Sequence, residues 1–272
     1  MLKPNITIAV LTHNRSWHFA QMLASIREYT TIPYVLKVLD TCSNLNHIEH
    51  VNQFRGEDFT DHILADKFYS CVEGRRIFLD YIDTEFTVYL DDDIRVGPLW
   101  LSSLMTPMIN DDNTGVVASN IVQEGKRVTS GVRKLKNNGR SFSVSEHLPE
   151  YRGEGDLSLG GATLYRTEAL RKTEYRKEFI GGYEDWDQTL QIKNDLNLKI
   201  QSSNATLFHY HMAESQGYFS DRWRWVELMD SALGIFDRWK IRTGVDKVLK
   251  HFIDNEITIP REQVERITEV LI

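Results

Sequence analysis

The spacing of apolar and polar residues predicts strands that alternate with helices along most of the chain. Short runs rich in β-branched residues are typical of buried strands, and longer segments with apolar residues three or four positions apart are typical of amphipathic helices. The predicted strands cover residues 6–12, 34–39, 62–65, 87–90, 115–119, 157–166, 198–200 and 205–211. The predicted helices cover residues 16–29, 70–81, 98–110 and 167–171, and a further helix opens over 181–187. This alternation indicates βαβ units and therefore an α/β fold with a mostly parallel sheet.

Three consecutive aspartates, residues 91–93, follow the strand-like run at 87–90. Open α/β sheets bind ligands beyond the carboxyl ends of their strands, so Thr12, Asp40 and this triplet are expected along one edge. Adjacent carboxylates repel one another, and a hard divalent cation bound with a phosphorylated ligand would relieve the repulsion. A solvated acidic turn would contain the same residues, so the triplet alone does not separate a Mg²⁺ or Mn²⁺ site from a turn.

The composition is that of a folded protein and restricts the classes of partner. The chain of 272 residues is long enough for one large domain, or for one domain with an appendage. A formal charge of −7 argues against nucleic-acid binding over the whole surface but allows a local basic patch. Cys42 and Cys71 have neither zinc-site nor disulfide spacing, which favours a reduced, cytosolic setting.

Membrane association is expected to be peripheral if it occurs. The first residues lack the order of charged, apolar and small residues of a signal peptide, and no apolar run is long enough to cross a bilayer. The segment from residue 218 onward is predicted to be helical and contains Trp223, Trp225, Phe236 and Trp239. Most of these rings should pack the helices onto the main domain, and the alternative is an interface for a partner or a membrane surface.

A basic stretch lies near the middle of the chain. Residues 125–140 contain six lysines and arginines and no acidic residue. Gly131 and the sequence at 137–139 suggest a hairpin or a mobile loop. A solvated loop is the simplest interpretation, and a surface that faces an anionic partner is the alternative.

Taken together, the order of these motifs resembles that of the GT-A fold glycosyltransferases, and more closely that of family 2, whose members are inverting enzymes. The resemblance extends over about residues 6–215. It implies a Rossmann-like GT-A domain over 1–214, with a nucleotide-sugar-binding half at 1–120 and an acceptor half at 121–214. Residues 215–272 would then form a helical extension at the carboxyl terminus.

The resemblance implies that the first half binds the donor. Thr12, Asn14 and Arg15 occupy the exit of the first strand, where polar residues of the family meet the nucleotide. Asp40 matches the acid of a D-x-x-S turn that binds the base or the ribose. Arg75 lies in a helical segment near the diphosphate, although the sequence there departs from the usual Ala-Arg-Asn.

The aspartate triplet matches the DxD motif of the family, and the resemblance separates its members. Asp93 is expected to bind Mn²⁺ or Mg²⁺, Asp91 to contact the ribose side of the donor, and Asp92 to do no more than shape the turn beside the donor. A further metal ligand is often a histidine on a late strand. His209 and His211 share one strand face and both remain candidates, with a slight preference for His209.

The resemblance also implies an acceptor side that carries the catalytic acids. Glu184 and Asp185 match an acid pair at the head of a helix, with Asp185 as the general base and Glu184 as the residue that orients it or the acceptor. Gly160 and Gly161 match a paired-glycine strand on the acceptor side, and Trp186 is expected to contact the acceptor there.

These residues predict an inverting, metal-dependent glycosyltransferase that moves a sugar from a nucleotide-sugar to a hydroxyl group. A UDP-sugar is favoured, because Asp40 can accept a hydrogen bond from the uracil N3–H. The expected acceptor is a glycan, a glycolipid or another anionic molecule, and a hydroxylated DNA base is an alternative that the basic stretch allows. A nucleotidyltransferase is less favoured because the first strand lacks a glycine-rich basic loop. An inactive nucleotide-sugar-binding module is less favoured because Asp93 and Asp185 are both present.

Overall fold

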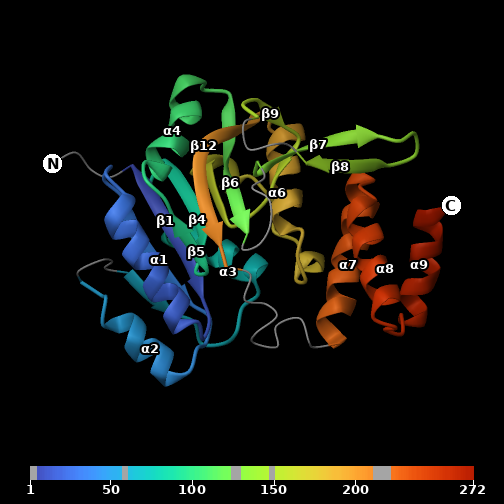
Figure 1. Cartoon of the computed structure of the whole chain (residues 1–272), viewed down its shortest axis with the longest axis horizontal. Coiled ribbons are helices and arrows are strands. Elements are labelled where there is room, and N and C mark those ends of the chain that lie inside the picture. Colours follow the sequence, from blue (N-terminus) through green and yellow to red (C-terminus); the bar gives the residue numbers. More distant parts are fainter. Residues whose placement is uncertain (1–4, 57–60, 124–129, 147–150, 211–221) are drawn as a thin grey trace.

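The computed structural model describes residues 5–56, 61–123, 130–146, 151–210 and 222–272 (Figure 1). Within these residues, nine strands form one sheet in the order β3-β2-β1-β4-β11-β6-β12-β5, with β9 paired to β12. The strands are β1 (Ile6–Thr12), β2 (Val35–Asp40), β3 (Asp61–Leu64), β4 (Phe86–Asp91), β5 (Ile94–Val96), β6 (Thr114–Gln123), β9 (Glu154–Gly155), β11 (Ala162–Arg166) and β12 (Lys199–His209). The predicted order of elements is present in the fold, except that the strand predicted over 157–166 is divided at the paired glycines: residues 157–158 belong to a separate three-stranded sheet and only β11 joins the main sheet.

The sheet is parallel in its amino-terminal part and mixed beyond it. Strand β1 runs parallel to β2 and β4, and β2 runs parallel to β3. Strand β11 is inserted antiparallel between β4 and β6, whereas β12 runs parallel to β6. The predicted fold class, an α/β protein with a large and mostly parallel sheet flanked by helices, is confirmed.

One predicted boundary is wrong, because the strand-like runs at 198–200 and 205–211 are joined in the single strand β12. The register against β6 shifts between Ser202 and Thr206, which marks a bulge. Within the bulge the Ser203 hydroxyl donates to the carbonyl of Ala118 at 2.9 Å and accepts from the amide of Ala205 at 3.2 Å. These side-chain bonds compensate for the missing backbone pairing, so the polar residues do not end the strand.

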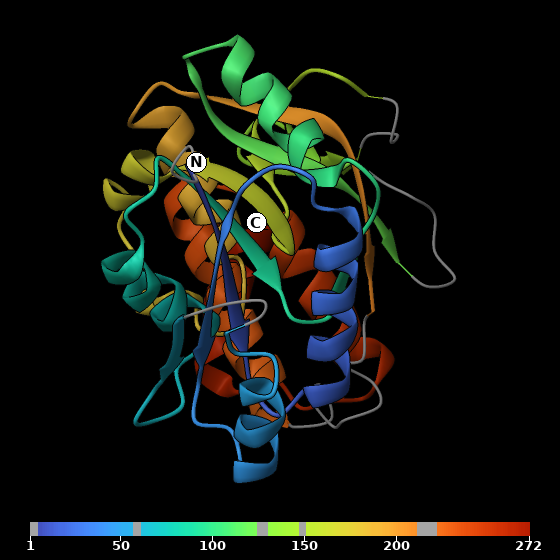
Figure 2. The same cartoon turned by 90° about the vertical axis from the view of Figure 1, so that its left-hand side faces the viewer.

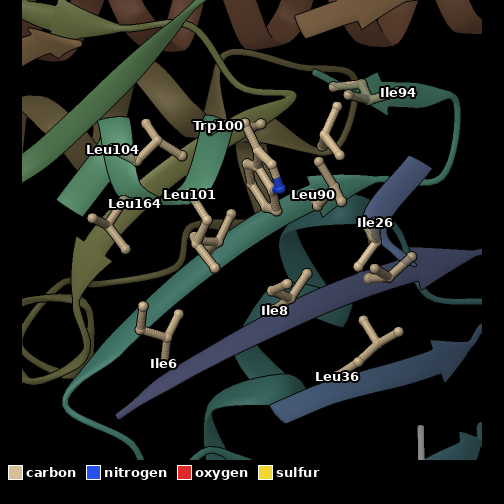
Figure 3. Close-up of a cluster of buried hydrophobic side chains, with 14 of the residues drawn as sticks. Ile6, Ile8, Ile26, Leu36, Leu90, Ile94, Trp100, Leu101, Leu104 and Leu164 are labelled. Atoms are coloured by element: carbon tan, nitrogen blue, oxygen red, sulfur yellow. The ribbon is translucent and has the colours of Figure 1, made fainter. Parts of the chain in front are cut away.

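Helices cover both faces of the sheet, and Figure 2 shows α1 and α3 on opposite sides of the strands. The helices that lie against the sheet are α1 (Ser16–Tyr29), α3 (Cys71–Phe78), α4 (Trp100–Asn110), α5 (Thr167–Arg171) and α6 (Glu184–Asn194), with α2 (Leu45–Asn52) beside β2 and two short 3₁₀ turns, η1 (Leu79–Tyr81) and η2 (Lys177–Phe179). Helices α1 and α4 enclose one core with the strands, including Ile8, Leu90 and Trp100 (Figure 3). Alternate strand residues such as Ala9 and Tyr89 face a second core under α3, α5 and α6.

A hairpin projects from the sheet region toward the carboxyl-terminal helices (Figure 1). It consists of β7 (Val132–Asn137) and β8 (Phe142–Glu146), and β10 (Leu157–Ser158) pairs with β7. The Asn137 side chain accepts from the amide of Gly139, whose φ of +90° suits a glycine in the turn. The hairpin predicted for the basic stretch is confirmed over this part, and residues 124–129 lie outside the described residues.

The tail is helical, as predicted, and forms α7 (Arg222–Trp239), α8 (Thr243–Asp254) and α9 (Arg261–Leu271). These helices share a core of their own that includes Leu233, Val248 and Phe252. A second apolar cluster joins α7 to η2 and α6. Among the described residues no helix has both the length and the apolar character needed to cross a membrane. The division into donor half, acceptor half and extension stays a prediction.

Candidate active site

The carboxyl ends of the parallel strands meet at one edge, where the sequence placed the candidate site. Thr12 at the end of β1 lies beside Asp40 at the end of β2, and Leu11 lies beside Asp91 at the end of β4. Because β1 pairs with both β2 and β4, residues from these three separate segments are neighbours. This is the edge at which open α/β sheets bind ligands.

Asp91, Asp93 and His209 form a group whose ligand atoms all lie within 4.8 Å of one another. Pairing of β5 with β12 sets His209 opposite Ile94, and the His209 Nε2 atom lies 3.2 Å from Asp93 Oδ1. Two carboxylates and one imidazole suit Mn²⁺, and the oxygen atoms also suit Mg²⁺. Asp91, Asp93 and His209 are therefore the residues that could hold a metal. His211 lies outside the described residues.

Burial and mutual repulsion of the aspartates are reflected in their pKa values. Burial raises the pKa of Asp92 to about 7, against the opposing charge of Arg15. Burial likewise raises the pKa of Asp91, against the charge of Arg75. For His209 burial lowers the pKa, but the hydrogen bond and charge of Asp93 outweigh it and the net pKa is raised. The site thus favours bound positive charge, whether protons or a cation.

Arg15 and Thr12 hold the middle of the aspartate triplet. The Arg15 Nη1 atom lies 3.0 Å from both Asp92 Oδ1 and Asp93 Oδ2, and the Thr12 hydroxyl donates to Asp92 Oδ2 at 2.8 Å. Asp92 is only 4% exposed. In this structure Thr12, Arg15 and Asp92 therefore contact one another, and their expected contacts with the donor stay a prediction.

Arg75 connects the metal-binding group to the acid pair. Its Nη1 donates to Glu184 Oε1 at 3.0 Å and its Nη2 lies 3.4 Å from Asp91 Oδ1. The guanidinium lies over the ring of Tyr89 at 5.3 Å, and Arg75 is only 5% exposed. The family resemblance implied that Arg75 lies near the diphosphate, but the sequence gave no sign of this bridge, because its partners lie far apart along the chain.

The acid pair stands at the first turn of α6. Asp185 accepts hydrogen bonds from the amides of Trp186, at 2.9 Å, and of Gly160. Burial and the neighbouring charge of Glu184 raise the pKa of Asp185 to about 7. An acid with such a pKa exchanges protons readily near neutral pH, as a general base must.

The paired glycines allow the strand before β11 to approach both sets of acids. A Cβ at Gly160 would lie 3.2 Å from Asp185 Oδ2, and Gly161, with φ of +102°, accepts from the amide of Asp91 at 2.9 Å. Trp186 is 6% exposed and packs edge-on against Tyr183 in an apolar cluster. Its expected contact with an acceptor stays a prediction.

Asp40 is fully buried and flanked by two histidines that the sequence did not single out. Its Oδ2 atom lies 3.7 Å from His47 Nε2 and 3.8 Å from His62 Nε2, and its Oδ1 accepts from the amide of Ser43 at 2.8 Å. Burial raises the pKa of Asp40, but the nearby His62 and the hydrogen bonds from Ser43 outweigh it and the net pKa is lowered. Asp40 is thus held as a carboxylate that can accept hydrogen bonds.

Asn14 links the ends of β1 and β2 around this carboxylate. Its backbone is left-handed, with φ of 54°, and its amide donates to Ser43 Oγ at 3.0 Å. Its side-chain oxygen accepts from the amide of Asn44 at 2.8 Å. These bonds shape the turn next to Asp40, and a direct contact of Asn14 with the donor stays a prediction.

Comparison with known proteins assigns the fold and the family. A family described as Glycosyl transferase family 2 matches residues 7–174, which is more than half of the chain. A comparison with curated proteins gave no match. The 1–349 segment of S. aureus TarS superposes with a TM-score of 0.61 at 16% identity, over 98% of this chain and 79% of that chain. The same segment in complex with UDP-GlcNAc gives a TM-score of 0.60.

GalNAc-T7, solved with UDP, GalNAc and Mn²⁺, superposes with a TM-score of 0.60 at 13% identity. That match covers 76% of this chain but only 44% of the GalNAc-T7 chain, so this chain spans less than half of that relative. At these identities the likeness concerns the fold, and both relatives support GT-A architecture. With the family match over 7–174, the chain belongs to glycosyl transferase family 2 and is a glycosyltransferase of GT-A fold.

Proposed function

We propose that the protein is an inverting, metal-dependent glycosyltransferase that transfers a sugar from a UDP-sugar to an acceptor hydroxyl. The observation that carries the proposal is the link from Asp91, Asp93 and His209 through Arg75 to Glu184. It sets a cation-binding group and an acid pair on two sides of one buried guanidinium. A sugar-phosphate bond between them would have a cation on the phosphate side and a base on the acceptor side.

Each set of residues has a separate task in this reaction. A Mn²⁺ or Mg²⁺ ion held by Asp91, Asp93 and His209 would supply Lewis-acid stabilisation for the leaving diphosphate. Asp185, whose pKa is raised to about 7, takes the proton of the acceptor hydroxyl as it attacks the anomeric carbon. A single base supports one direct displacement, and therefore inversion. Glu184, fixed by Arg75, orients Asp185 or the acceptor.

The proposed donor nucleotide rests on Asp40. This carboxylate has a lowered pKa and accepts hydrogen bonds at neutral pH. Because Asp40 is fully buried, the turn that encloses it would have to open for the carboxylate to meet the uracil N3–H. Thr12, Asn14 and Arg15 lie next to Asp40 at the end of β1 and would complete the donor side with Asp91 and Asp92. The relatives solved with UDP and UDP-GlcNAc support the same class of donor.

A UDP-sugar with Mn²⁺ is expected to raise the melting temperature by about 5 °C at a ligand concentration 100 times Kd. GDP-sugars should give less stabilisation if Asp40 meets a pyrimidine base, whereas TDP-sugars do not test this contact because thymine carries the same N3–H as uracil. Asp93→Asn should abolish the part of the shift that depends on Mn²⁺, since it removes one of the three proposed ligands. A thermal-shift assay with a panel of donors, each with Mn²⁺ or with a chelator, measures these effects.

Asp112→Asn provides the matched control, because this aspartate side chain is fully exposed and lies outside the site. It should keep the complete Mn²⁺-dependent shift. Stabilisation by GDP-sugars alone would refute the assignment of Asp40 to uracil. A full Mn²⁺ effect in Asp93→Asn would refute the proposed metal site.

For the acceptor we propose an anionic glycan or glycolipid that contacts the β7–β8 hairpin. The hairpin carries exposed Lys136 and Arg140 near its turn, and β7 pairs with β10 just before Gly160. The hairpin thus carries exposed positive charge on a strand that pairs with the segment before Gly160. Within this proposal residues 1–120 bind the donor, 121–214 bind the acceptor, and 215–272 are the extension. A cytosolic setting, with at most peripheral membrane contact, also stays a proposal.

The double variant Lys136→Gln, Arg140→Gln is expected to raise KM for an anionic acceptor several-fold at low salt, with the donor KM unchanged. Added salt should weaken acceptor binding in the wild type more than in the variant, because exposed charges are screened. Initial rates between about 50 and 300 mM salt give the dependence of the acceptor KM on salt concentration, with Lys172→Gln as an exposed-lysine control. An equal salt dependence in the wild type and the double variant would exclude the hairpin as the acceptor surface. Turnover of hydroxylated DNA would favour the DNA-base alternative.

A further inference from the structure

The acid pair follows a loop whose backbone angles are unfavourable, so contacts with neighbouring elements must hold the loop in place. Gly182 has φ of +140° and Tyr183, the residue before α6, has φ of 68°. A left-handed tyrosine persists only where surrounding contacts enforce it. The position of Glu184 and Asp185 therefore depends on what contacts the loop from behind.

Helix α7 crosses the loop in direct contact. A Cβ at Gly181 would lie 2.6 Å from the backbone C of Glu227 and from the N of Leu228, so only glycine fits under the helix. The buried Ser231 hydroxyl accepts from the amide of Gly181 at 3.2 Å and donates to the carbonyl of Glu178 at 2.9 Å. One side chain of α7 thus joins both ends of the segment that leads into the acid pair.

The ring of Tyr183 is held on two sides. It packs edge-on against Trp186 with the ring centres 4.9 Å apart. On the other side a Cβ at Gly244 of α8 would lie only 3.0 Å from Tyr183 Cζ, which shows how closely that helix approaches. The carboxyl-terminal helices therefore enclose the residue with the strained backbone.

The first turn of α6 is tied to the end of α7 through Asp187, which is 1% exposed. Its carboxylate accepts from Trp239 Nε1 at 2.6 Å and from Gln191 Nε2 at 2.8 Å, and it lies 3.1 Å from Arg238 Nε. The amide of Asp187 donates to the carbonyl of Tyr183 at 3.0 Å. A buried carboxylate that loses one of these donors must shift or be left unsatisfied, and the turn that carries Asp185 shifts with it.

We propose that α7 positions the acid pair, with Ser231 and the Asp187–Trp239 hydrogen bond as its two points of attachment. Ser231, Asp187 and Trp239 are positioning residues, since they act on the reaction through Glu184 and Asp185. This inference rests on the proposed function, because it takes the acid pair as the catalytic group. It makes the helical extension part of the working enzyme rather than an appendage.

Trp239→Phe tests the proposal because it removes one N–H donor and keeps an aromatic ring. Turnover, measured as release of UDP from a UDP-sugar, should fall about tenfold, with the donor KM within about twofold of wild type. Hydrogen–deuterium exchange of the amides of residues 181–187 should rise about tenfold, since the loop opens more often. Ser231→Ala should show the same pair of effects from the other attachment.

Trp225→Phe is the matched control, since Trp225 lies on the same helix but stacks on His251 with the ring centres 3.4 Å apart. It should change neither turnover nor exchange over 181–187. Unchanged exchange in Trp239→Phe would overturn the proposal, and so would raised exchange with full turnover. An equal loss of turnover in Trp239→Phe and Trp225→Phe would also overturn the proposal, because it would indicate general destabilisation.

A wild type that released UDP from no donor would count against the proposed function and not against the support of the loop. The exchange measurement needs no substrate and separates the two. Raised exchange in Trp239→Phe but not in Trp225→Phe would still support the attachment of the loop to α7, and equal exchange in both would refute it.

Discussion

Asp185→Asn is expected to lower turnover by about 10²–10⁴-fold while leaving the affinity for the UDP-sugar close to that of the wild type. Asparagine has the size of aspartate but cannot take the proton of the acceptor hydroxyl. Donor binding should persist because Asp40, at the end of β2, and the metal-binding group, on and after β4 and at the end of β12, lie on other elements than Asp185 of α6. Steady-state release of UDP and calorimetric titration of the donor with Mn²⁺ measure the two quantities.

Asp185→Asn also needs a structural control, because Asp185 accepts hydrogen bonds from two backbone amides. Asparagine would point its NH₂ group at either the amide of Gly160 or the amide of Trp186, which disturbs the turn. Asp156→Asn is a matched change, because Asp156 is a half-buried acid that accepts from the amide of Leu135 at 2.7 Å. It should unfold at a lower temperature than the wild type yet retain turnover. Near-normal turnover of Asp185→Asn at saturating substrate would show that another group is the base.

The same carboxyl sets the expected pH dependence. Asp185 acts as a base only when ionised, and its pKa is raised to about 7 by burial and by Glu184. The value of kcat/KM should therefore fall about tenfold per pH unit below pH 7 and level off above it. Stability should change in the opposite direction. The folded protein holds this proton more tightly than the unfolded chain, whose pKa is near 3.8, so the carboxyl disfavours folding increasingly from pH 4 to pH 7.

Arg75→Gln is expected to lower the free energy of unfolding by about 3–5 kcal/mol in the absence of metal. The change leaves Asp91 and Glu184 near one another without the buried guanidinium that lies between them. Mn²⁺ should then restore more stability in the variant than in the wild type, because a cation beside Asp91 replaces part of the lost positive charge. Urea unfolding with and without Mn²⁺ measures both effects.

Arg166→Gln serves as the control for the loss of a half-buried arginine. Arg166 donates to the carbonyls of Thr114, at 2.8 Å, and Met108, at 3.1 Å, at the far end of β11 from the aspartates. It should lose stability without any added response to Mn²⁺. If Mn²⁺ stabilised both variants and the wild type equally, Arg75 would have no electrostatic link to the metal-binding group.

Sequence reasoning succeeded where the information is local. The apolar periods are set by residues within one element, so the order of strands and helices could be read directly. The common edge of Thr12, Asp40 and Asp91 followed from the parallel direction of β1, β2 and β4. The role expected for Asp185 came from the resemblance of Glu184 and Asp185 to the acid pair of the family, and it stays a prediction because the family match ends at residue 174.

The sequence could not predict contacts between segments far apart. The bridge from Arg75 to Glu184 joins α3 to α6, and no period or spacing relates those positions. The approach of α7 to Gly181 is equally non-local, although the paired glycines at 181–182 are a signal of close contact in hindsight. Strand β12 was divided in two because its bulge is satisfied by the Ser203 side chain, which local polarity does not reveal.

The insertion of β11 between β4 and β6 also constrains the order in which a newly made chain can fold. Strand β4 pairs with β1 on one side, but its other partner is synthesised only with residues 162–166. Until then the strand that ends in the aspartates has an open edge, which favours misassociation between partly folded chains. His209 arrives later still, at the end of β12. The proposed metal site is therefore complete only in a finished sheet, so bound metal would stabilise the end product of folding and not its early intermediates.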